Sequence, residues 1–596
     1  MNRRIVACSA SLIALLALTL AHSDCFGQNV RPMDPQFRRP VAMLLLHDRL
    51  LVANQRSGSI SSIDPATGNV VSEIAVGEQL SDLIALPDGK SVLALDEAKG
   101  EAIQLTISGG SSTIAQRFAV GTSPVTSCLW PDQKTCSIAL LWAHRLAIVD
   151  LGDGAYPHAR VSRTIDLPFA PRLQWISPDR KTLLVADSFS GMMALFDLPA
   201  GALRGYRWID ANNIRGIAGS ADGRDVHISH LMLASDLPTE RDRVFWGQLL
   251  ANTLRTVNAE HLLYPAERES LAVPYAIEHW KTFPLGVTNN GAGDPGQIIA
   301  PADGSLLVAL SGVDQVGLRP HPDERLLCIN VGRRPTALAM DSHKHVTYIA
   351  NTLDDSISVI DLPSFSVVKT ISLGPQPKPT AADRGESLFY DARLSLDGWY
   401  SCASCHTDGH TCGQLNDNYT DGSFNTPKRI LSLRGVADTG PWAWNGSNAT
   451  LEDQIKTSIV STMKGPAGAA SEQNISDLAA YLRTLKLAPS LDAARGTVDG
   501  PMVAKGRQIF GRLDCASCHR PPTYTSAKTF DVGLHDEVDL KKFNPPSLRG
   551  VSQLPALFHD NRARDLREVI TRFGHPDGQV MPAEDVDALV AFLRSL

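Results

Sequence analysis

The stretch "LLVANQRSGSISSIDPATGNVVSEIAVG" (residues 50–77) predicts three short strands joined by polar turns. The stretch "TYIANTLDDSISVIDLPSFSVVKTISLG" (347–374) repeats this pattern almost residue for residue. Fainter copies lie between them, for example "RLAIVDLGDG" (145–154) and "PDRKTLLVAD" (178–187), and the 86 residues from Asp64 to Asp150 correspond to two units of 43. A four-stranded unit of this length cannot bury both of its faces alone. The repeats therefore predict a radial stack of sheets, a β-propeller.

The copies between about residues 41 and 373 predict seven blades, and we expect the propeller to span residues 36–375. Residues 234–290 show helical spacing and few repeat features, so we expect them to be an insertion. The repeats resemble the YVTN-type seven-bladed propellers, with "LVAN" and "YIAN" in place of the motif that names the family. This resemblance implies a fold but no particular activity, because such propellers serve as enzyme bodies and as binding platforms.

The N-terminus predicts export from the cytoplasm. Arg3 and Arg4 precede the apolar run "LIALLALTLA" (12–21), so residues 1–27 have the pattern of a signal peptide and the mature protein is expected in the periplasm or another extracytoplasmic space. A membrane anchor is the alternative reading of the run, and Cys25 suggests a lipoprotein, although Asp24 stands where a small residue is required. With 20% charged residues, a net charge of −7 and no basic patch, no nucleic-acid partner is expected.

Two cysteines of the propeller, Cys128 and Cys136, flank a predicted turn between two strands. In an oxidising compartment they form either a cross-strand disulfide or two buried free thiols, and the sequence does not decide between these.

The stretch "GPQPKPTAADRG" (374–385) ends the propeller pattern, because its closely spaced prolines indicate a linker. Strand periodicity stops there, and "SDLAAYLRTL" (476–485) and "VDALVAFLRSL" (586–596) predict amphipathic helices instead. The fold class is therefore multidomain: an all-β seven-bladed propeller followed by a mostly α module. We expect two domains in that module, residues 376–490 and 491–596.

The sequence "CASCH" occurs twice, at residues 402–406 and 515–519. The C-x-x-C-H pattern is typical of c-type haem attachment, in which both thiols form thioethers and the adjacent histidine binds the iron. A zinc site would need a second pair of ligands, and Cys412 with His410 offers only a short loop. The sequence therefore predicts two covalently bound c-type haems, held by Cys402, Cys405, His406, Cys515, Cys518 and His519.

The segments around the two motifs are duplicated. "FNTPKRILSLRGVADTGPWAWNGSNATLEDQ" (424–454) and "FNPPSLRGVSQLPALFHDNRARDLREVI" (543–570) share the order Asn-x-Pro, Leu-Arg-Gly-Val, aromatic residue, polar turn, helix. This tandem resembles the bacterial di-haem cytochrome c peroxidase family, which includes MauG-type enzymes. The resemblance implies that one haem meets peroxide, that the other relays electrons, that Trp444 aids the transfer and that Gln454 lies near the peroxide site. Asn445 replaces the aspartate of the family's Trp-Asp-Gly motif.

Other departures from the family concern the first iron. Lys464 stands at the position of the catalytic glutamate, and Asp417 stands at that of the distal histidine. The sixth ligand of this iron is therefore left open between Met463, His410 and a water-bound or vacant position.

At the second haem, "GQVMPAEDVDALVAFLRSL" resembles the Met-Pro loop and final helix of class I cytochromes c, so Met581 is the expected sixth ligand. Phe573 stands at the family's usual methionine position, and His575 is the rival ligand.

The sequence thus predicts an exported di-haem oxidoreductase. Its expected reaction is peroxidase-like reduction of hydrogen peroxide or a related oxidant, with a small cytochrome or cupredoxin as electron donor. One alternative is an electron-transfer cytochrome without turnover. Another is a binding or surface protein whose propeller docks a redox partner.

Overall fold

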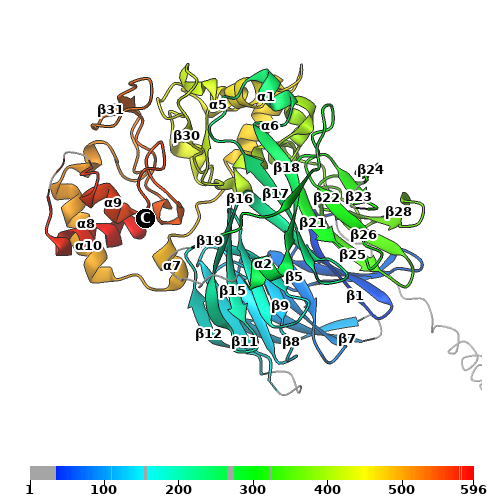
Figure 1. Ribbon diagram of the computed structural model, residues 1–596. Coiled ribbons are helices and arrows are strands. Elements are labelled where there is room, and N and C mark those ends of the chain that lie inside the picture. Colours follow the sequence, from blue (N-terminus) through cyan, green and yellow to red (C-terminus); the bar gives the residue numbers. More distant parts are fainter. Residues whose placement is uncertain are drawn as a thin grey trace, which may run out of the picture.

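The structure is a computed structural model that describes residues 35–108, 111–152, 158–264, 274–321, 324–575, 578 and 580–596. The expected signal peptide and Cys25 lie outside the described residues. Within them, a ring of sheets carries one haem-motif domain above it and a second domain at its side (Figure 1). No helix among the described residues is long and apolar enough to cross a membrane.

Antiparallel sheets succeed one another around the ring. The first three contain β1 (Pro40–Leu46), β2 (Arg49–Asn54), β3 (Ser59–Asp64) and β4 (Asn69–Ala75); β5 (Leu80–Ala85), β6 (Ser91–Asp96), β7 (Glu101–Ser108) and β8 (Ser111–Ala119); and β9 (Pro124–Leu129), β10 (Thr135–Leu140), β11 (Arg145–Asp150) and β12 (Arg160–Asp166). The last two contain β21 (Pro295–Ile299), β22 (Leu306–Leu310), β23 (Gln315–Arg319) and β24 (Leu327–Asn330); and β25 (Pro335–Asp341), β26 (Val346–Asn351), β27 (Ser356–Asp361) and β28 (Ser366–Ser372).

The sheet between these groups has eight strands and contains two blades. It comprises β13 (Pro171–Ile176), β14 (Thr182–Asp187), β15 (Ser190–Asp197), β16 (Ala202–Gly219), β17 (Asp225–Leu233), β18 (Leu250–Asn258), β19 (Tyr275–Ala276) and β20 (Lys281–Pro284). The long strand β16 is the outermost strand of the fourth blade up to Asn212 and the innermost strand of the fifth beyond it, because it pairs first with β15 and then with β17. The described residues therefore form seven blades, and the expected all-β propeller is confirmed.

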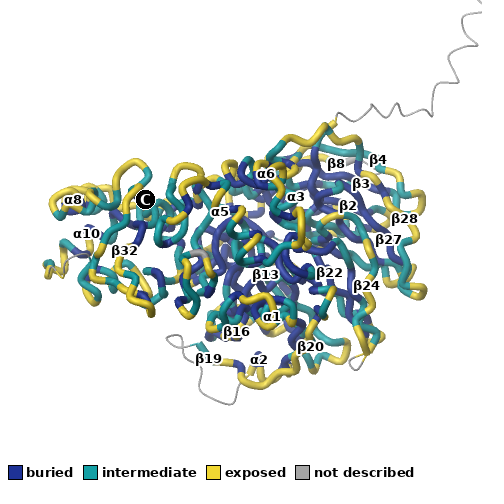
Figure 2. Tube along the Cα trace, turned by 90° about the horizontal axis from the view of Figure 1, so that it is seen from above, coloured by how far each residue is buried: buried dark blue, intermediate teal, exposed yellow. Residues whose placement is uncertain are grey.

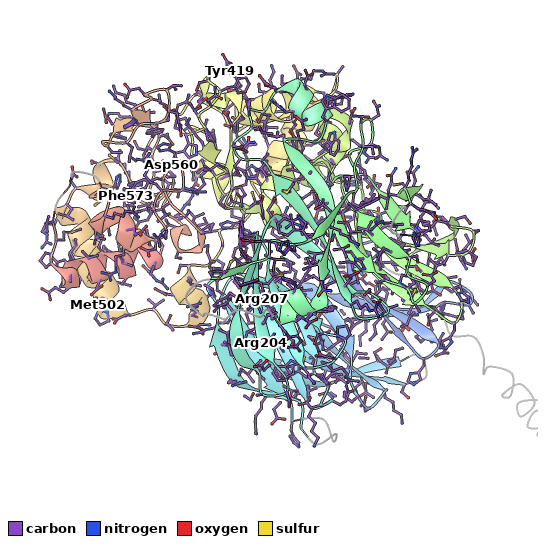
Figure 3. The ribbon with its side chains drawn as sticks, viewed as in Figure 1. Arg204, Arg207, Tyr419, Met502, Asp560 and Phe573 are labelled. Atoms are coloured by element: carbon purple, nitrogen blue, oxygen red, sulfur yellow. The ribbon has the colours of Figure 1, made fainter. Side chains whose placement is uncertain are left out.

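Residues 234–290 differ from the expected insertion. Strands β18 and β20 lie in this range and complete the fifth blade. Among the described residues of this range, only α1 (Arg241–Phe245) and α2 (Ala259–Leu263) are helical. Arg207 on β16 is fully buried and donates from Nε to the carbonyl oxygen of Leu262, which holds α2 against the sheet (Figure 3). Weak repeat similarity in this blade hid strands that tertiary pairing stabilises.

Burial follows the position of each strand within its blade. The second strands β6 and β14 are buried along their whole length, because neighbouring blades cover both faces. The outermost strands β12 and β28 are mostly exposed, which keeps the sheet edges polar. Viewed from above, the propeller interior is dark blue and the periphery yellow (Figure 2).

The two thiols of the third blade are free. Cys128 pairs with Ser137 across β9 and β10, whereas Cys136 pairs with Leu129. Because directly opposed residues share a face, the two cysteines lie on opposite faces of the sheet and in separate hydrophobic clusters. This geometry favours the free thiols over the disulfide.

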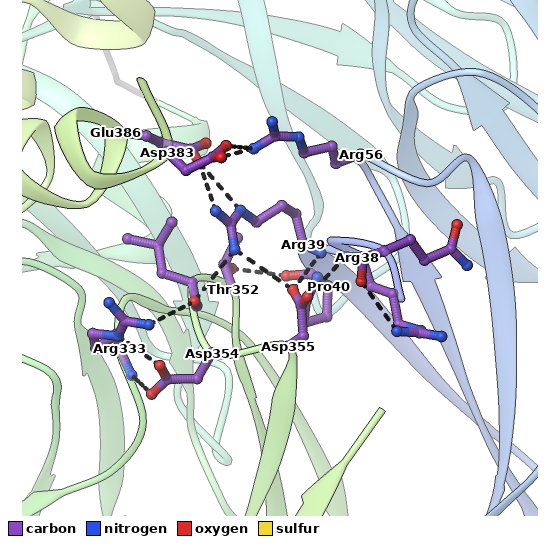
Figure 4. A network of polar contacts seen from close by, with 12 residues as sticks. Arg38, Arg39, Pro40, Arg56, Arg333, Thr352, Asp354, Asp355, Asp383 and Glu386 are labelled. Atoms are coloured by element: carbon purple, nitrogen blue, oxygen red, sulfur yellow. Dashed lines mark hydrogen bonds and ion pairs between the residues drawn. The ribbon is translucent and has the colours of Figure 1, made fainter. Parts of the chain in front are cut away.

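The ring closes where the first and last blades meet. Asp355 accepts from the backbone N–H groups of Arg38 (2.9 Å) and Arg39 (2.8 Å), joining the chain before β1 to the last blade (Figure 4). The side chains of Arg39 and Arg56 then reach α3 (Ala381–Phe389), where Arg39 pairs with Glu386 at 2.8 Å and Arg56 with Asp383 at 2.6 Å. One polar network therefore closes the ring and anchors the start of the haem module.

The haem module contains two similar helical domains. The first has α3, α4 (Cys402–Cys405), α5 (Leu451–Thr457), α6 (Glu472–Leu482) and the short pair β29 (Leu415–Asn416) and β30 (Lys428–Arg429). The second has α7 (Leu491–Arg495), α8 (Gly500–Arg512), α9 (Leu566–Thr571), α10 (Ala583–Arg594) and the pair β31 (Phe530–Asp531) and β32 (Lys542–Phe543).

The duplication is visible in one helix crossing of each domain. A Cβ on Gly385 of α3 would lie 1.9 Å from the carbonyl oxygen of Asp477 on α6, and a Cβ on Gly506 of α8 would lie 1.9 Å from that of Ala588 on α10. Both crossings therefore require glycine. They bring the entry helix of each domain against its closing helix and place the attachment motif that follows.

Candidate haem sites

The first attachment motif is a single helical turn capped by serines. Ser401 accepts from the N–H of Ala403, and Ser404 accepts from the N–H of Ser401, which forms a capping box around Cys402–Cys405. Both hydroxyls also donate to the propeller residue Asp294, each at 2.5 Å. Burial raises the pKa of Asp294. The propeller thus orients the turn that carries the two thiols.

Further propeller groups hold the chain on both sides of this turn. Asn213 donates to the carbonyl oxygen of Ser404 at 2.8 Å, and Asn252 donates to that of Trp399 at 2.7 Å. A Cβ on Gly291 would lie 2.5 Å from the Cα of Trp399, so a glycine is needed for the backbones to approach this closely. Sequence reasoning missed these residues, because they come from blades distant in the chain and carry no motif.

His406 follows the helical turn directly. Burial lowers the pKa of His406 to about 4, so its imidazole is neutral near pH 7, the form that binds metals. Its Nδ1 atom is buried and has no hydrogen-bond partner. Burial also raises the pKa of the Cys402 thiol to about 12 and that of Cys405 well above its usual value. Both thiols are therefore protonated near pH 7.

A cavity of about 300 Å³ opens beside this motif. Its wall includes the two thiols, the proximal histidine and the other candidate site residues Trp444, Gln454, Met463 and His410, whereas Asp417 and Lys464 lie outside it. Most of the remaining wall is apolar and includes Ile455, Ile459, Leu478 and Leu482. An apolar cavity with a few polar groups suits a planar cofactor.

Arg429 supplies a further sign that the cavity receives an acidic group. Its side chain is buried, its Nη1 has no hydrogen-bond partner, and desolvation lowers its pKa to about 10. A buried cation without a counterion is costly. A haem carries carboxylates that would pair with this guanidinium, so the residues present fit the group. The residue was not predicted, since one arginine beside the Leu-Arg-Gly motif gives no specific signal.

Trp444 and Gln454 both lie in this wall. The indole N–H of Trp444 donates to the carbonyl oxygen of Arg429 at 2.9 Å. On the other side, the ring of Trp444 faces that of His559 from the second domain, with centroids 6.2 Å apart, and His559 stacks on Phe543 at 4.5 Å. Gln454 accepts from Asn448 at 2.9 Å and donates to Ser458 at 3.2 Å. Trp444 therefore connects the first cavity with aromatic groups of the second domain.

Both protein candidates for the sixth ligand of the first iron, Met463 and His410, line this cavity. Met463 is 4% exposed and follows a π-helical turn (Ser458–Thr462) that directs the chain along the cavity wall. His410 has both ring nitrogens within hydrogen-bonding distance of other groups, Ser432 Oγ (2.9 Å) and the Gln553 carbonyl oxygen (3.3 Å), and it packs against propeller aromatics. Burial lowers the pKa of His410 to about 3. The geometry therefore favours Met463 over His410.

The cavity offers little acid–base chemistry. Lys464 is outside its wall, and burial lowers the pKa of this ammonium. Asp421 is the one carboxylate among the described lining residues. It pairs with Lys428 at 2.5 Å, and Lys428 also pairs with Asp536 of the second domain at 3.0 Å. This carboxylate is therefore committed to an ion pair with Lys428, which also reaches the second domain.

The second motif lies outside the propeller contact. Cys515 and Cys518 are partly buried on and beside a 3₁₀ turn (Cys515–Ser517). His519 donates from Nδ1 to the carbonyl oxygen of Tyr524 at 3.1 Å, and burial lowers its pKa to about 4. Met581 is partly buried against the apolar cluster that also contacts Cys515. The site is thus a neutral histidine beside two thiols at an apolar wall, as a haem requires.

A family model described as di-haem cytochrome c peroxidase matches residues 379–496, and one described as cytochrome c matches residues 503–596. Residues 379–496 are thus similar to di-haem cytochrome c peroxidases, and residues 503–596 are similar to cytochrome c. The cofactors of such proteins are c-type haems.

Relatives of this module include known peroxidases. The cytochrome c peroxidase Ccp of Escherichia coli is 26% identical over 286 residues, which are 37% of this chain and 60% of that protein. The methylamine utilization protein MauG of Methylorubrum extorquens is 30% identical over 234 residues, 32% of this chain and 65% of that protein. The chain thus spans less than two thirds of the length of these two relatives.

The propeller resembles solved structures only distantly. A chain of Kuenenia stuttgartiensis hydrazine synthase aligns over 56% of this chain and 99% of its own length, with 19% identity and a TM-score of 0.46. Virginiamycin B lyase from Staphylococcus aureus aligns over 54% of this chain and 94% of its own length, with 13% identity and a TM-score of 0.40.

Proposed function

We propose that this protein is an exported oxidoreductase that binds two covalent c-type haems and reduces hydrogen peroxide or a related oxidant at the first of them. The observation that carries the proposal is the single cavity in which Cys402, Cys405, His406, Trp444 and Gln454 meet. Bound haem iron supplies the electron exchange for breaking the O–O bond. The balanced reaction consumes hydrogen peroxide, two electrons and two protons and releases two waters.

The chain's own residues position the reactants. Neutral His406 would supply an imidazole ligand to the haem iron, and the apolar part of the wall would keep bulk water away from it. Gln454 presents its amide at the wall, held in place by Asn448 and Ser458, and provides a hydrogen-bonding group for a bound oxidant. Arg429 would pair with the carboxylates of the cofactor.

Electrons enter through the second domain in this proposal. A small cytochrome or cupredoxin docks beside the partly exposed Cys515 and Cys518, and Trp444 with His559 and Phe543 forms the aromatic route to the first cavity. The periplasm is the proposed location, because haem attachment and the N-terminal pattern of residues 1–27 both indicate export.

The propeller acts as a scaffold for the first haem domain. Asp294, Asn213 and Asn252 hold its attachment turn, so the face of the propeller that carries these residues is already covered. A protein partner on the propeller would therefore dock on another surface.

Rapid mixing with peroxide tests the peroxidase proposal. We expect the half-reduced protein to change its haem spectrum on mixing and to oxidise a reduced cytochrome or cupredoxin slowly. Positioned proton transfer contributes about 10²–10⁴-fold, and the paired Asp421 leaves this contribution unfilled. A protein with two haems by mass whose half-reduced spectrum peroxide leaves unchanged contradicts the proposal.

A non-catalytic electron carrier is the second candidate. The buried position of Met463 on the cavity wall favours it, since a thioether that closes the iron would block the oxidant. Met463→Ala separates the two functions. A peroxidase gains reactivity with peroxide before any reduction, whereas a carrier has no turnover in either form.

A further inference from the structure

His575 lies beside His519, the histidine of the second haem-attachment motif. It follows α9 in the loop that leads towards α10, and its ring centroid lies 6.4 Å from that of His519, with the ring planes inclined by 69°. His519 is oriented by the hydrogen bond from its Nδ1 to Tyr524, so its Nε2 points away from that carbonyl group. The imidazole rings of His519 and His575 are therefore close neighbours.

The separation matches two imidazoles that share one metal. Histidine nitrogens bind metals at about 2.0–2.1 Å, so two rings on opposite sides of one ion have centres roughly 6 Å apart. Stacked rings such as His559 and Phe543 lie closer, at 4.5 Å. The distance between His519 and His575 is thus longer than a stacked contact and suited to an ion between them.

The surroundings hold His575 in this place. Its backbone N–H donates to the carbonyl oxygen of Val569 at 3.1 Å, and its ring packs edge-on against Phe558 at 5.7 Å. Phe558 in turn packs against Phe573, which lies beside the helices of the second domain (Figure 3). Phe558, Phe573 and Cys515 all contact one apolar cluster, so this wall lies beside the Cys515 thiol.

We infer that His575 is the second axial ligand of the haem attached at Cys515 and Cys518, opposite His519. Met581, the ligand expected from the Met-Pro pattern, then serves as a packing residue at the edge of the apolar cluster before α10. The inference rests on the proposed second haem. Two imidazoles give a lower potential than an imidazole with a thioether, so the electron donor must be correspondingly more reducing.

Spectroscopy of the full-length haem protein tests the assignment. We expect Met581→Ala to leave the oxidised spectrum and the potential of the second haem unchanged. His575→Ala should convert one low-spin haem to a high-spin form that added imidazole restores. His575→Met should introduce the weak thioether-to-iron charge-transfer band and raise the potential of that haem.

A defined spectroscopic result would contradict the assignment of His575. A charge-transfer band that Met581→Ala removes and Met463→Ala retains assigns the ligand to Met581 and overturns the inference. If His575→Ala yields no folded protein, the wild-type, Met581→Ala and His575→Met spectra still decide. The haem count by mass distinguishes failure of the proposed function from failure of the ligand assignment. One haem contradicts the proposed function. Two haems with a charge-transfer band that depends on Met581 contradict only the assignment of His575.

Discussion

Trp444 lies where the two haem domains meet. Its indole donates to Arg429 of the first domain and its ring faces His559 of the second. Trp444→Phe retains an aromatic ring and removes the donor, which leaves a buried carbonyl group unsatisfied at a cost of about 1–3 kcal/mol. We expect slower electron equilibration between the haems, measured after rapid partial reduction. Trp246→Phe is the control, since Trp246 is 61% exposed on the propeller; an equal rate in both variants would exclude Trp444 as a relay.

The ion pairs of Lys428 give a prediction about stability. It joins Asp421 of its own domain to Asp536 of the second domain, and the three side chains are nearly inaccessible, at 9%, 7% and 0% exposure. Lys428→Met removes the shared cation and leaves two buried carboxylates, a change that costs about 3–5 kcal/mol. Chemical denaturation of the haem protein should show this loss.

A surface ion pair provides the control for Lys428. Lys541 and Asp539 lie 3.1 Å apart but are both exposed, so Lys541→Met should change the free energy of unfolding by about 0–1 kcal/mol. Equal effects of the two substitutions would contradict the buried interdomain pair.

Among the elements, those with strong periodicity were predictable from sequence. The repeats at 50–77 and 347–374 became β2–β4 and β26–β28, and Asn54 and Asn351 make the same hydrogen bonds to two serines in their respective blades. Two strands of the fifth blade were missed, because β18 and β20 have little repeat similarity and depend on pairing with β17 and with each other.

The glycine crossings give a prediction for the helices. Gly506→Ala would place a methyl group 1.9 Å from the Ala588 carbonyl oxygen, so α8 and α10 must separate, at about 1–3 kcal/mol. Gly511→Ala lies on the same helix with no atom within 4 Å of the new Cβ, and should stabilise the domain by about 0.5–1 kcal/mol. Thermal unfolding of the two variants checks the difference. Shifts of the same sign would contradict the close crossing.

For the whole molecule, the sequence predicted the order of the domains but not how they dock. The attachment motif and the spacing of Trp444 and Gln454 identified one wall of the cavity. Asp294, Asn213 and Arg429 had no such signal. Asp294 and Asn213 act across more than a hundred residues of chain, and only the folded ring brings them to the first motif. The interface between the propeller and the first haem-attachment motif was therefore not predictable from the sequence.

Asp408 forms ion pairs across the interface between the first haem domain and the propeller. Its carboxylate lies 2.5 Å from Arg172 and 3.4 Å from Arg215 of the propeller. Although burial opposes ionisation, these arginines together with Arg434 hold the pKa of Asp408 far below its usual range. A carboxyl group whose pKa is lower in the folded state stabilises the protein above its unfolded pKa of about 3.9, and this contribution is lost as the pH falls.

Asp408→Asn removes the negative charge of this carboxylate and keeps the shape of the side chain. Charge-assisted hydrogen bonds contribute about 1.5–3 kcal/mol, so we expect the variant to lose stability by that amount at pH 7 and to show a smaller decline between pH 5 and pH 3 than the wild type. Denaturation midpoints across this range provide the measurement. Asp166→Asn is the control, because Asp166 pairs with Arg495 at 3.3 Å at a more exposed contact between the propeller and the second domain. If Asp408→Asn declines with acid as steeply as the wild type, the carboxylate does not hold the haem domain on the propeller.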